Sequence, residues 1–199
     1  MKKFSLTIII PIGPGDLSWR FLLENLKAIF LSEVVPFEID IVLCFCQDDE
    51  ELFLKERDFF KNQEGLPIKL VISKRGRSIQ LNKGAENADG DFLWFLHADS
   101  KLEASSLFKL YQSILDEPKA LHYFNLTFLR DGPFLTCLNE WGAKLRSEIF
   151  KIPFGDQGFC LKKENFWFLG GFLVGGEKKG GEDHLLVWEV RKKGLSLRN

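Results

Sequence analysis

Polar residues that could bind a ligand or move a proton follow several apolar runs of this 199-residue sequence. Asp48 and Asp49 follow one run, residues 74–77 follow another, and His97-Ala98-Asp99 follows a third. Near the C-terminus, Glu182-Asp183 comes directly after a glycine-rich stretch. A carboxylate in such a position can hold a hard cation through its oxygens or accept a proton as a general base. Either chemistry requires a fold that brings these residues to one place.

The spacing of apolar residues predicts alternating strands and helices through the first 116 residues. Short continuous apolar runs are typical of buried parallel strands, and apolar residues at helical spacing indicate amphipathic helices. Strands are expected at residues 6–11, 39–46, 68–72 and 91–96, and helices at 19–31, 50–61, 78–88 and 105–115. In the less regular second half, a strand is expected at 120–128 and helices at 134–150 and 182–193.

This alternation predicts an α/β fold with a Rossmann-like, open, mostly parallel sheet and helices on both faces. Ligands of such sheets bind beyond the carboxyl ends of the strands. The polar residues that follow the strands are therefore expected to gather at one edge of the sheet.

Composition limits the classes of function. The 27 basic and 28 acidic side chains almost cancel, so no general field attracts DNA or RNA, and no nucleic-acid partner is expected. The four cysteines, Cys44, Cys46, Cys137 and Cys160, have neither zinc-ligand spacing nor a disulfide pattern, and buried thiols are the preferred interpretation. No apolar stretch approaches the roughly 20 residues that span a bilayer, and no signal peptide is apparent. We expect a soluble, cytoplasmic protein without a transmembrane segment.

The stretch from Gly76 to Leu102 resembles family 2 nucleotide-sugar glycosyltransferases, whose fold is called GT-A. The family pattern runs from an Asn-x-Gly helix, through Gly-Asp and an apolar strand, to a short Asp-x-Asp motif. The residues that match this pattern in register are Asn82, Gly84, Gly90, Asp91 and Asp99. The resemblance extends over most of the chain, and it implies the GT-A fold and a nucleotide-sugar donor.

The resemblance implies that Asp99 binds a divalent cation, Mn²⁺ or Mg²⁺, which neutralises the donor diphosphate. His97 stands at the first acidic position of the motif. Its imidazole suits Mn²⁺ better than Mg²⁺, or it only lines the pocket. Without the resemblance, the simpler interpretation is that Asp99 caps a following helix, with Ser100 and Glu103 nearby.

The pair Glu182-Asp183 corresponds to a Glu-Asp pair that carries the catalytic base in the family. We assign the base to Asp183 and a supporting catalytic role to Glu182. Attack of an acceptor hydroxyl from the face opposite the leaving diphosphate would invert the anomeric configuration. The alternative is that both acids merely favour the N-terminus of a helix.

Donor binding is expected from residues of the first half. The family commonly ends its second strand in an acidic residue that binds the nucleobase, and Asp48 is the best match, with Asp49 next. The family's Arg-Asn pair is Leu81-Asn82 here, so Asn82 is retained as a donor-binding candidate. Arg77, one helical turn earlier, is predicted to reach the phosphates in place of the missing arginine.

A Gly-Asp-Gln-Gly motif at residues 155–158 offers Asp156 and Gln157 to sugar or acceptor hydroxyls, or forms a polar turn. This version looks like that of a small single-domain subgroup resembling arsenosugar-biosynthesis glycosyltransferases. Trp141, Trp167 and Trp188 lie beside leucines at helical spacing, and core positions are expected for them.

The sequence thus predicts a metal-dependent, inverting glycosyltransferase that uses a nucleotide sugar, most simply a UDP-sugar, and a small-molecule or glycolipid acceptor. One domain is expected over 1–199, with a nucleotide-binding half at 1–103 and an acceptor-side half at 104–199. A nucleotidyltransferase is disfavoured, because Gly13-Pro14-Gly15-Asp16 supplies no basic residue after the first strand. A nucleotide-binding or interaction module with this fold and little turnover is the other alternative, since the Arg-Asn arginine is lost and Glu189 stands where relatives carry another.

Overall fold

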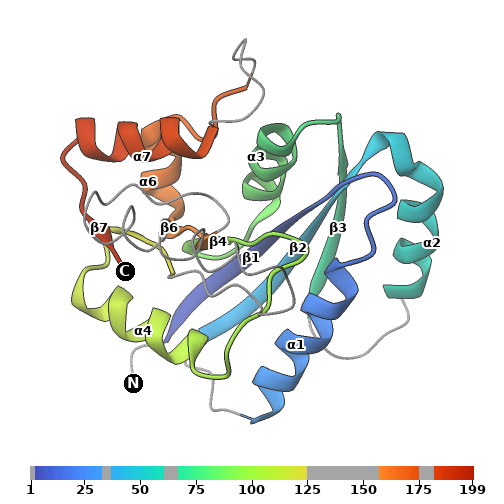
Figure 1. Cartoon of the computed structure of the whole chain (residues 1–199), viewed down its shortest axis with the longest axis horizontal. Helices are drawn as coiled ribbons and strands as arrows, with labels where there is room; N and C mark the ends of the chain where they lie inside the picture. Colours follow the sequence, from blue (N-terminus) through green and yellow to red (C-terminus); the bar gives the residue numbers. More distant parts are fainter. Residues whose placement is uncertain (1–2, 33–36, 61–66, 125–156, 175–181) are drawn as a thin grey trace, which may run out of the picture.

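A computed structural model describes residues 3–32, 37–60, 67–124, 157–174 and 182–199 (Figure 1). The strands are β1 (Phe4–Ile12), β2 (Phe37–Cys46), β3 (Ile68–Ser73), β4 (Phe92–Phe95), β5 (Leu121–His122), β6 (Cys160–Lys162) and β7 (Leu197–Arg198). The helices are α1 (Trp19–Ser32), α2 (Glu50–Phe60), α3 (Arg77–Asn87), α4 (Ser106–Asp116), α6 (Lys163–Leu169) and α7 (Glu182–Lys192). A short 3-10 turn, η1 (Gln47–Asp49), joins β2 to α2.

Within the described residues the strands form a seven-stranded sheet in the order β3-β2-β1-β4-β6-β5-β7. The first four strands in this order run parallel, and β5 is parallel to β7. Only β6 runs antiparallel to its neighbours β4 and β5. The predicted open, mostly parallel sheet is confirmed.

Helices cover both faces of the sheet because the side chains of its strands alternate between two cores. Along β1, Leu6, Ile8 and Ile10 enter the core that also holds the buried faces of α1 and α4. Ile9 points the other way, into the core shared with α3, α6 and α7. Figure 1 shows these two layers, with α3, α6 and α7 above the sheet and α1 and α4 below it.

Two glycines allow α3 and the start of β4 to approach the central strands. A Cβ at Gly84 would lie 2.4 Å from Ile9 Cγ2 and 2.8 Å from Cys44 Sγ. A Cβ at Gly90 would lie 2.6 Å from the backbone nitrogen of Thr7. Neither position can therefore hold a residue larger than glycine without moving its neighbours. Both glycines belong to the Gly76–Leu102 stretch that carries the family resemblance.

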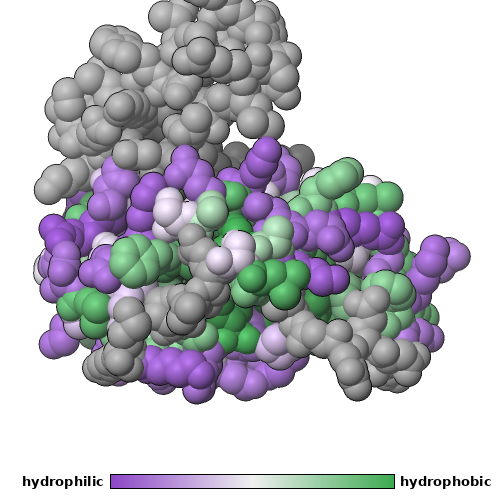
Figure 2. All heavy atoms as spheres, turned by 90° about the horizontal axis from the view of Figure 1, so that it is seen from below, coloured by the Kyte–Doolittle hydropathy of each residue, from purple (hydrophilic) through white to green (hydrophobic). Residues whose placement is uncertain are grey.

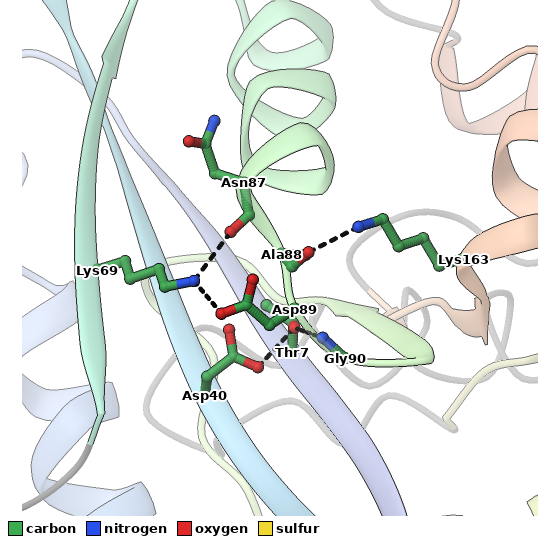
Figure 3. A network of polar contacts seen from close by, with 8 residues as sticks. All are labelled: Thr7, Asp40, Lys69, Asn87, Ala88, Asp89, Gly90 and Lys163. Atoms are coloured by element: carbon green, nitrogen blue, oxygen red, sulfur yellow. Dashed lines mark hydrogen bonds and ion pairs between the residues drawn. The ribbon is translucent and has the colours of Figure 1, made fainter.

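The C-terminal end of α3 is held by two lysines that approach it from opposite sides (Figure 3). Lys69 contacts the Asn87 carbonyl at 3.5 Å and forms an ion pair with Asp89, while Lys163 Nζ donates to the Ala88 carbonyl at 2.6 Å. Cations at a helix C-terminus satisfy its unpaired carbonyls and favour its dipole.

The turn between α3 and β4 is also held by the buried hydroxyl of Thr7 (Figure 3). Thr7 Oγ1 donates to Asp40 at 2.6 Å and accepts from the Gly90 backbone N–H at 2.8 Å. This bond ties the turn before β4 to β1 and fixes the level at which α3 ends.

The first turn of α3 is anchored by Gln80, which is 5% exposed. Its Nε2 donates to the carbonyl of Ile12 at 2.8 Å and to that of Cys44 at 2.7 Å. Both carbonyls lie at or near the carboxyl ends of their strands, β1 and β2. The N-terminus of α3 is therefore fixed at the edge where a ligand is expected.

Several sequence expectations need adjustment in the second half. The strand expected at 120–128 is described only as β5, the helix expected at 134–150 lies outside the described residues, and β6, α6 and β7 are additional elements. Cys44, Cys46 and Cys160 are buried free thiols, as preferred, and burial raises the pKa of Cys44 and Cys160 well above the ordinary range. Cys137 lies outside the described part.

The core positions expected for the tryptophans are wrong for two of them. Trp167 is 40% and Trp188 66% exposed, because they lie on the outward faces of α6 and α7, whose inward faces carry residues such as Phe166 and Val187. Trp141 lies outside the described residues. Figure 2 shows the molecule from below relative to Figure 1, and on this face too hydrophobic side chains lie between hydrophilic ones at the surface. Among the described helices, none is long and apolar enough to cross a membrane.

Candidate active site

The carboxyl ends of β1, β2 and β3 are joined by side chains from the loops that follow them. Asp49 in η1 accepts a hydrogen bond from the Gly15 backbone N–H at 2.9 Å, which ties the loop after β1 to the end of β2. Arg75, in the loop after β3, lies 3.5 Å from Asp48. The Asp48 side chain remains 40% exposed. Of the two acids considered for the nucleobase, Asp49 is engaged in the loop structure and Asp48 is the more accessible to a ligand.

Three predicted site residues from distant parts of the chain meet at this edge. Arg77 begins α3, His97 follows β4, and Asp183 lies in the first turn of α7. Arg77 Nη1 donates to Asp183 Oδ2 at 2.7 Å, and Arg77 Nη2 lies 2.5 Å from His97 Nε2. The Arg77 and Asp183 side chains are 29% and 12% exposed. The other oxygen of Asp183, Oδ1, is buried and has no hydrogen-bond partner among the described residues.

The contact with Arg77 defines the state of His97. A guanidinium has only donors, so His97 Nε2 must accept and the ring proton must reside on Nδ1. Neither nitrogen of His97 then presents a lone pair to a cation. Ligation of a metal by His97 would first require Arg77 to release Nε2, and the His97 ligand stays a prediction.

Asp99 lies in the turn after β4, which a backbone bond from Ser100 N–H to the His97 carbonyl closes at 3.1 Å. Its carboxylate is exposed at the carboxyl edge of the sheet. Mg²⁺ and similar hard cations are often held by one or two carboxylates together with substrate phosphates, so a single exposed aspartate at this edge fits such an ion. No group of three or more His, Cys, Asp or Glu side chains suited to a metal occurs in the described ranges.

Asn82 uses both atoms of its amide within the protein. Its Nδ2 donates to the Phe172 carbonyl at 2.7 Å, and its Oδ1 accepts from the Phe172 backbone N–H at 2.9 Å. These two hydrogen bonds hold the Gly170-Gly171-Phe172 turn against α3. The described contacts give Asn82 an architectural role, and its donor contact stays a prediction.

The remaining predicted residues are placed only in part. Gln157 is 2% exposed, and its Nε2 donates to the Phe124 carbonyl at 3.0 Å. Glu182 is the first residue of α7, and Asp156 lies outside the described residues. An acceptor role for Asp156 and Gln157 therefore stays a prediction.

Gln80 is a contributor to the candidate site that was missed at the level of sequence, and Arg75 was expected there only as one of the polar residues 74–77. Gln80 had a detectable signal, since it is a polar residue on the helix face that also carries Leu81, Gly84 and Ala85. Nothing in the spacing of Arg75 points to its contact with Asp48.

The comparisons with known proteins agree with this fold. The family profile described as Glycosyl transferase family 2 matches residues 50–174. Among solved structures, the mannosyltransferase PcManGT from Pyrobaculum calidifontis, in complex with GDP-Man and Mn²⁺, superposes with a TM-score of 0.72 at 18% identity, covering 100% of this chain and 55% of that one. TarS 1-349 from S. aureus, in complex with UDP-GlcNAc, superposes with a TM-score of 0.67 at 15% identity, covering 93% of this chain and 52% of that one.

The chain thus spans about half the length of these solved structures. No curated protein sequence matches it. At such low identity the structural likeness shows the GT-A type of fold alone, while the profile match extends over more than half of the chain.

Proposed function

Because the chain belongs to glycosyl transferase family 2, we propose that it transfers a sugar from a nucleotide-diphosphate donor to a hydroxyl acceptor. The observation that carries this proposal is the Asp183 carboxylate, buried at the carboxyl edge of the sheet with Oδ1 free of hydrogen-bond partners among the described residues. A buried carboxylate oxygen without a hydrogen-bond partner lowers the stability of the fold unless a ligand donates a hydrogen bond to it. The hydroxyl group of the molecule that receives the sugar can donate such a hydrogen bond to Oδ1.

In the proposed reaction, Asp183 accepts the proton of the acceptor hydroxyl as its oxygen attacks the anomeric carbon. The bond from that carbon to the diphosphate oxygen breaks, and the nucleoside diphosphate leaves with the electron pair. General base catalysis of this kind contributes about 10²–10⁴-fold. Attack opposite the leaving group inverts the anomeric configuration. Glu182 is proposed to support Asp183.

The donor is proposed to lie along the ends of β2 and β4. Asp48, exposed beside Arg75, is proposed to bind the nucleobase. Asp99 would hold a divalent cation, Mn²⁺ or Mg²⁺, which supplies charge neutralisation to the departing diphosphate. A mannosyltransferase with GDP-Man and Mn²⁺ among the similar structures supports the choice of donor class and ion. The finer expectations, a UDP-sugar donor, a small-molecule or glycolipid acceptor and the arsenosugar-like subgroup, stay predictions.

The test begins with thermal unfolding of the full chain in the presence of UDP, GDP, UDP-GlcNAc or GDP-mannose, each with and without Mn²⁺. A ligand that binds only the folded state stabilises it by about 2.7 kcal/mol at one hundred times its Kd. We expect a Mn²⁺-dependent rise of Tm with one nucleotide series. Flat melting curves across the panel would contradict the proposal and favour a module without turnover.

Two substitutions then separate binding from chemistry. Asp99→Asn is expected to abolish the dependence on Mn²⁺, while Asp183→Asn is expected to keep nucleotide binding and to lose about 100-fold or more in donor turnover. Asp58→Asn on α2, where the side chain is 67% exposed, is the matched control. It should change neither the dependence on Mn²⁺ nor the donor turnover. Full activity of both site variants would show that the assignment of the site is wrong.

A further inference from the structure

The guanidinium of Arg77 stands between two predicted functional groups that come from opposite ends of the sequence. It donates to Asp183 Oδ2 from one amino group and approaches His97 Nε2 with the other. The pair with Asp183 joins residues separated by 106 positions in the chain. Because both side chains are largely buried, solvent screens this contact less than a surface ion pair.

The two oxygens of Asp183 have different surroundings. Oδ2 is engaged by Arg77, whereas Oδ1 is buried without a hydrogen-bond partner in the described part of the chain. A charge-assisted hydrogen bond to one oxygen restrains the rotation of the carboxylate and so determines which oxygen is left for a ligand.

We propose that Arg77 is the positioning residue of the catalytic base: it holds Asp183 Oδ2 so that Oδ1 faces the acceptor hydroxyl. This inference depends on the proposed function, in which Asp183 is that base. It gives Arg77 a role on the acceptor side of the reaction, different from the phosphate contact expected from the sequence.

The geometry requires an arginine at this position. The planar guanidinium presents two amino groups at a fixed separation, one to a carboxylate and one to an imidazole. A lysine offers a single ammonium on a flexible stem, which can engage one partner at full strength but does not reproduce the fork. Arg77→Lys is therefore expected to be only a partial substitute.

The backbone that carries Arg77 is fixed independently of its side chain. Gln80 bonds the first turn of α3 to the ends of β1 and β2, and Lys69 and Lys163 hold its last carbonyls. Loss of the Arg77 side chain is therefore expected to free the Asp183 carboxylate without moving α3. This separates a positioning role from a general loss of folding.

The experiment compares Arg77→Gln, Arg77→Lys and Asp183→Asn with the wild-type full chain. Binding of UDP and GDP with Mn²⁺ is measured by calorimetry, and release of nucleoside diphosphate from UDP-GlcNAc and GDP-mannose gives kcat and KM. Arg77→Gln is expected to lower kcat about 100-fold while the nucleotide Kd changes less than about threefold. Added guanidinium, at a concentration that does not unfold the protein, is expected to restore part of the rate.

The double variant Arg77→Gln/Asp183→Asn gives a second readout. Residues that act as a unit are strongly non-additive, so this variant is expected to be no slower than Asp183→Asn alone. Arg57→Gln, on α2 beside Asp58, is the matched control for loss of an exposed arginine and should keep the wild-type rate. Urea unfolding of each variant checks that it folds. If Arg77→Gln does not fold, Arg77→Lys, for which an intermediate kcat is expected, still tests the inference.

Each outcome decides the inference. A normal kcat with a nucleotide Kd weakened tenfold or more (about 1.4 kcal/mol) in Arg77→Gln would overturn it and identify a phosphate contact. Additive losses in the double variant would also overturn it. If the wild-type chain binds neither nucleotide and turns over neither donor, the proposed function fails and the inference fails with it. Wild-type turnover with unaffected Arg77 variants would refute the inference alone.

Discussion

Replacing Gln80 by leucine tests how the first turn of α3 is held at the candidate site. Leucine is close to glutamine in size and suits a helix, so the main change is the loss of one amide group. That amide donates to the carbonyls of Ile12 and Cys44 in a position that is 5% exposed. Gln80→Leu therefore leaves two carbonyl oxygens buried without these donors.

The expected magnitude follows from those two oxygens. A buried polar group that loses its partner costs about 1–3 kcal/mol. Two such groups, with some relaxation shared between them, should lower the free energy of unfolding by about 2–4 kcal/mol. For a chain of this size the corresponding fall in Tm is roughly 5–15 °C.

The assay is urea unfolding followed by tryptophan fluorescence and by far-UV circular dichroism, with coincident transitions as the check on two-state behaviour. Gln112→Leu on α4 is the matched control, because the same chemical change there affects an exposed side chain and should stay within about 0.5 kcal/mol. A Gln80→Leu variant as stable as the control would refute the argument that these two bonds anchor α3.

Three further predictions concern stability. Gly90→Ala should lower the free energy of unfolding by at least about 2 kcal/mol, because its Cβ meets the Thr7 backbone at 2.6 Å and no side-chain rotation relieves the contact; a neutral result in urea would show that the turn can move. Burial lowers the pKa of His122 to about 4 from 6.5, although nearby Glu117 raises it, so the unfolded chain binds more protons and stability should fall as the pH drops from 6.5 towards 4. Unfolding at a series of pH values should show a slope of up to about 1.4 kcal/mol per pH unit that His122→Gln flattens, and an unchanged slope would count against the buried neutral imidazole. Phe166→Ala should cost about 3–5 kcal/mol, whereas Trp188→Ala, at a 66% exposed position, should stay within about 0.5 kcal/mol; equal losses would contradict the outward placement of Trp188.

The first half of the fold was predictable because its signals are local. Continuous apolar runs mark β1 to β4, and helical spacing marks α1 to α4, so the alternation alone indicates a parallel sheet covered on both faces. Strands as short as β5, β6 and β7 carry too few residues for a period to be read. Their pairing with distant partners, such as Trp94 opposite Cys160, was not available from local pattern.

The motif that pointed to the family is explained mainly by packing. Gly84 and Gly90 are close-approach positions, and Asn82 clasps the Phe172 turn. By contrast, the contact of Arg77 with Asp183 depends on how α7 returns to the sheet, and residues 106 positions apart give no spacing signal. The sequence therefore indicated candidate residues for the site but not which of them touch.

The position of β6 has a consequence for how the chain reaches its final form. When a nascent chain has emerged only as far as α4, one side of β4 has no partner, because β6 follows much later. An open strand of four buried apolar residues is a template for pairing with other chains. A fragment that ends before β6 should therefore associate with itself or need a chaperone, and supplying residues 157–199 in trans should protect it by completing the sheet.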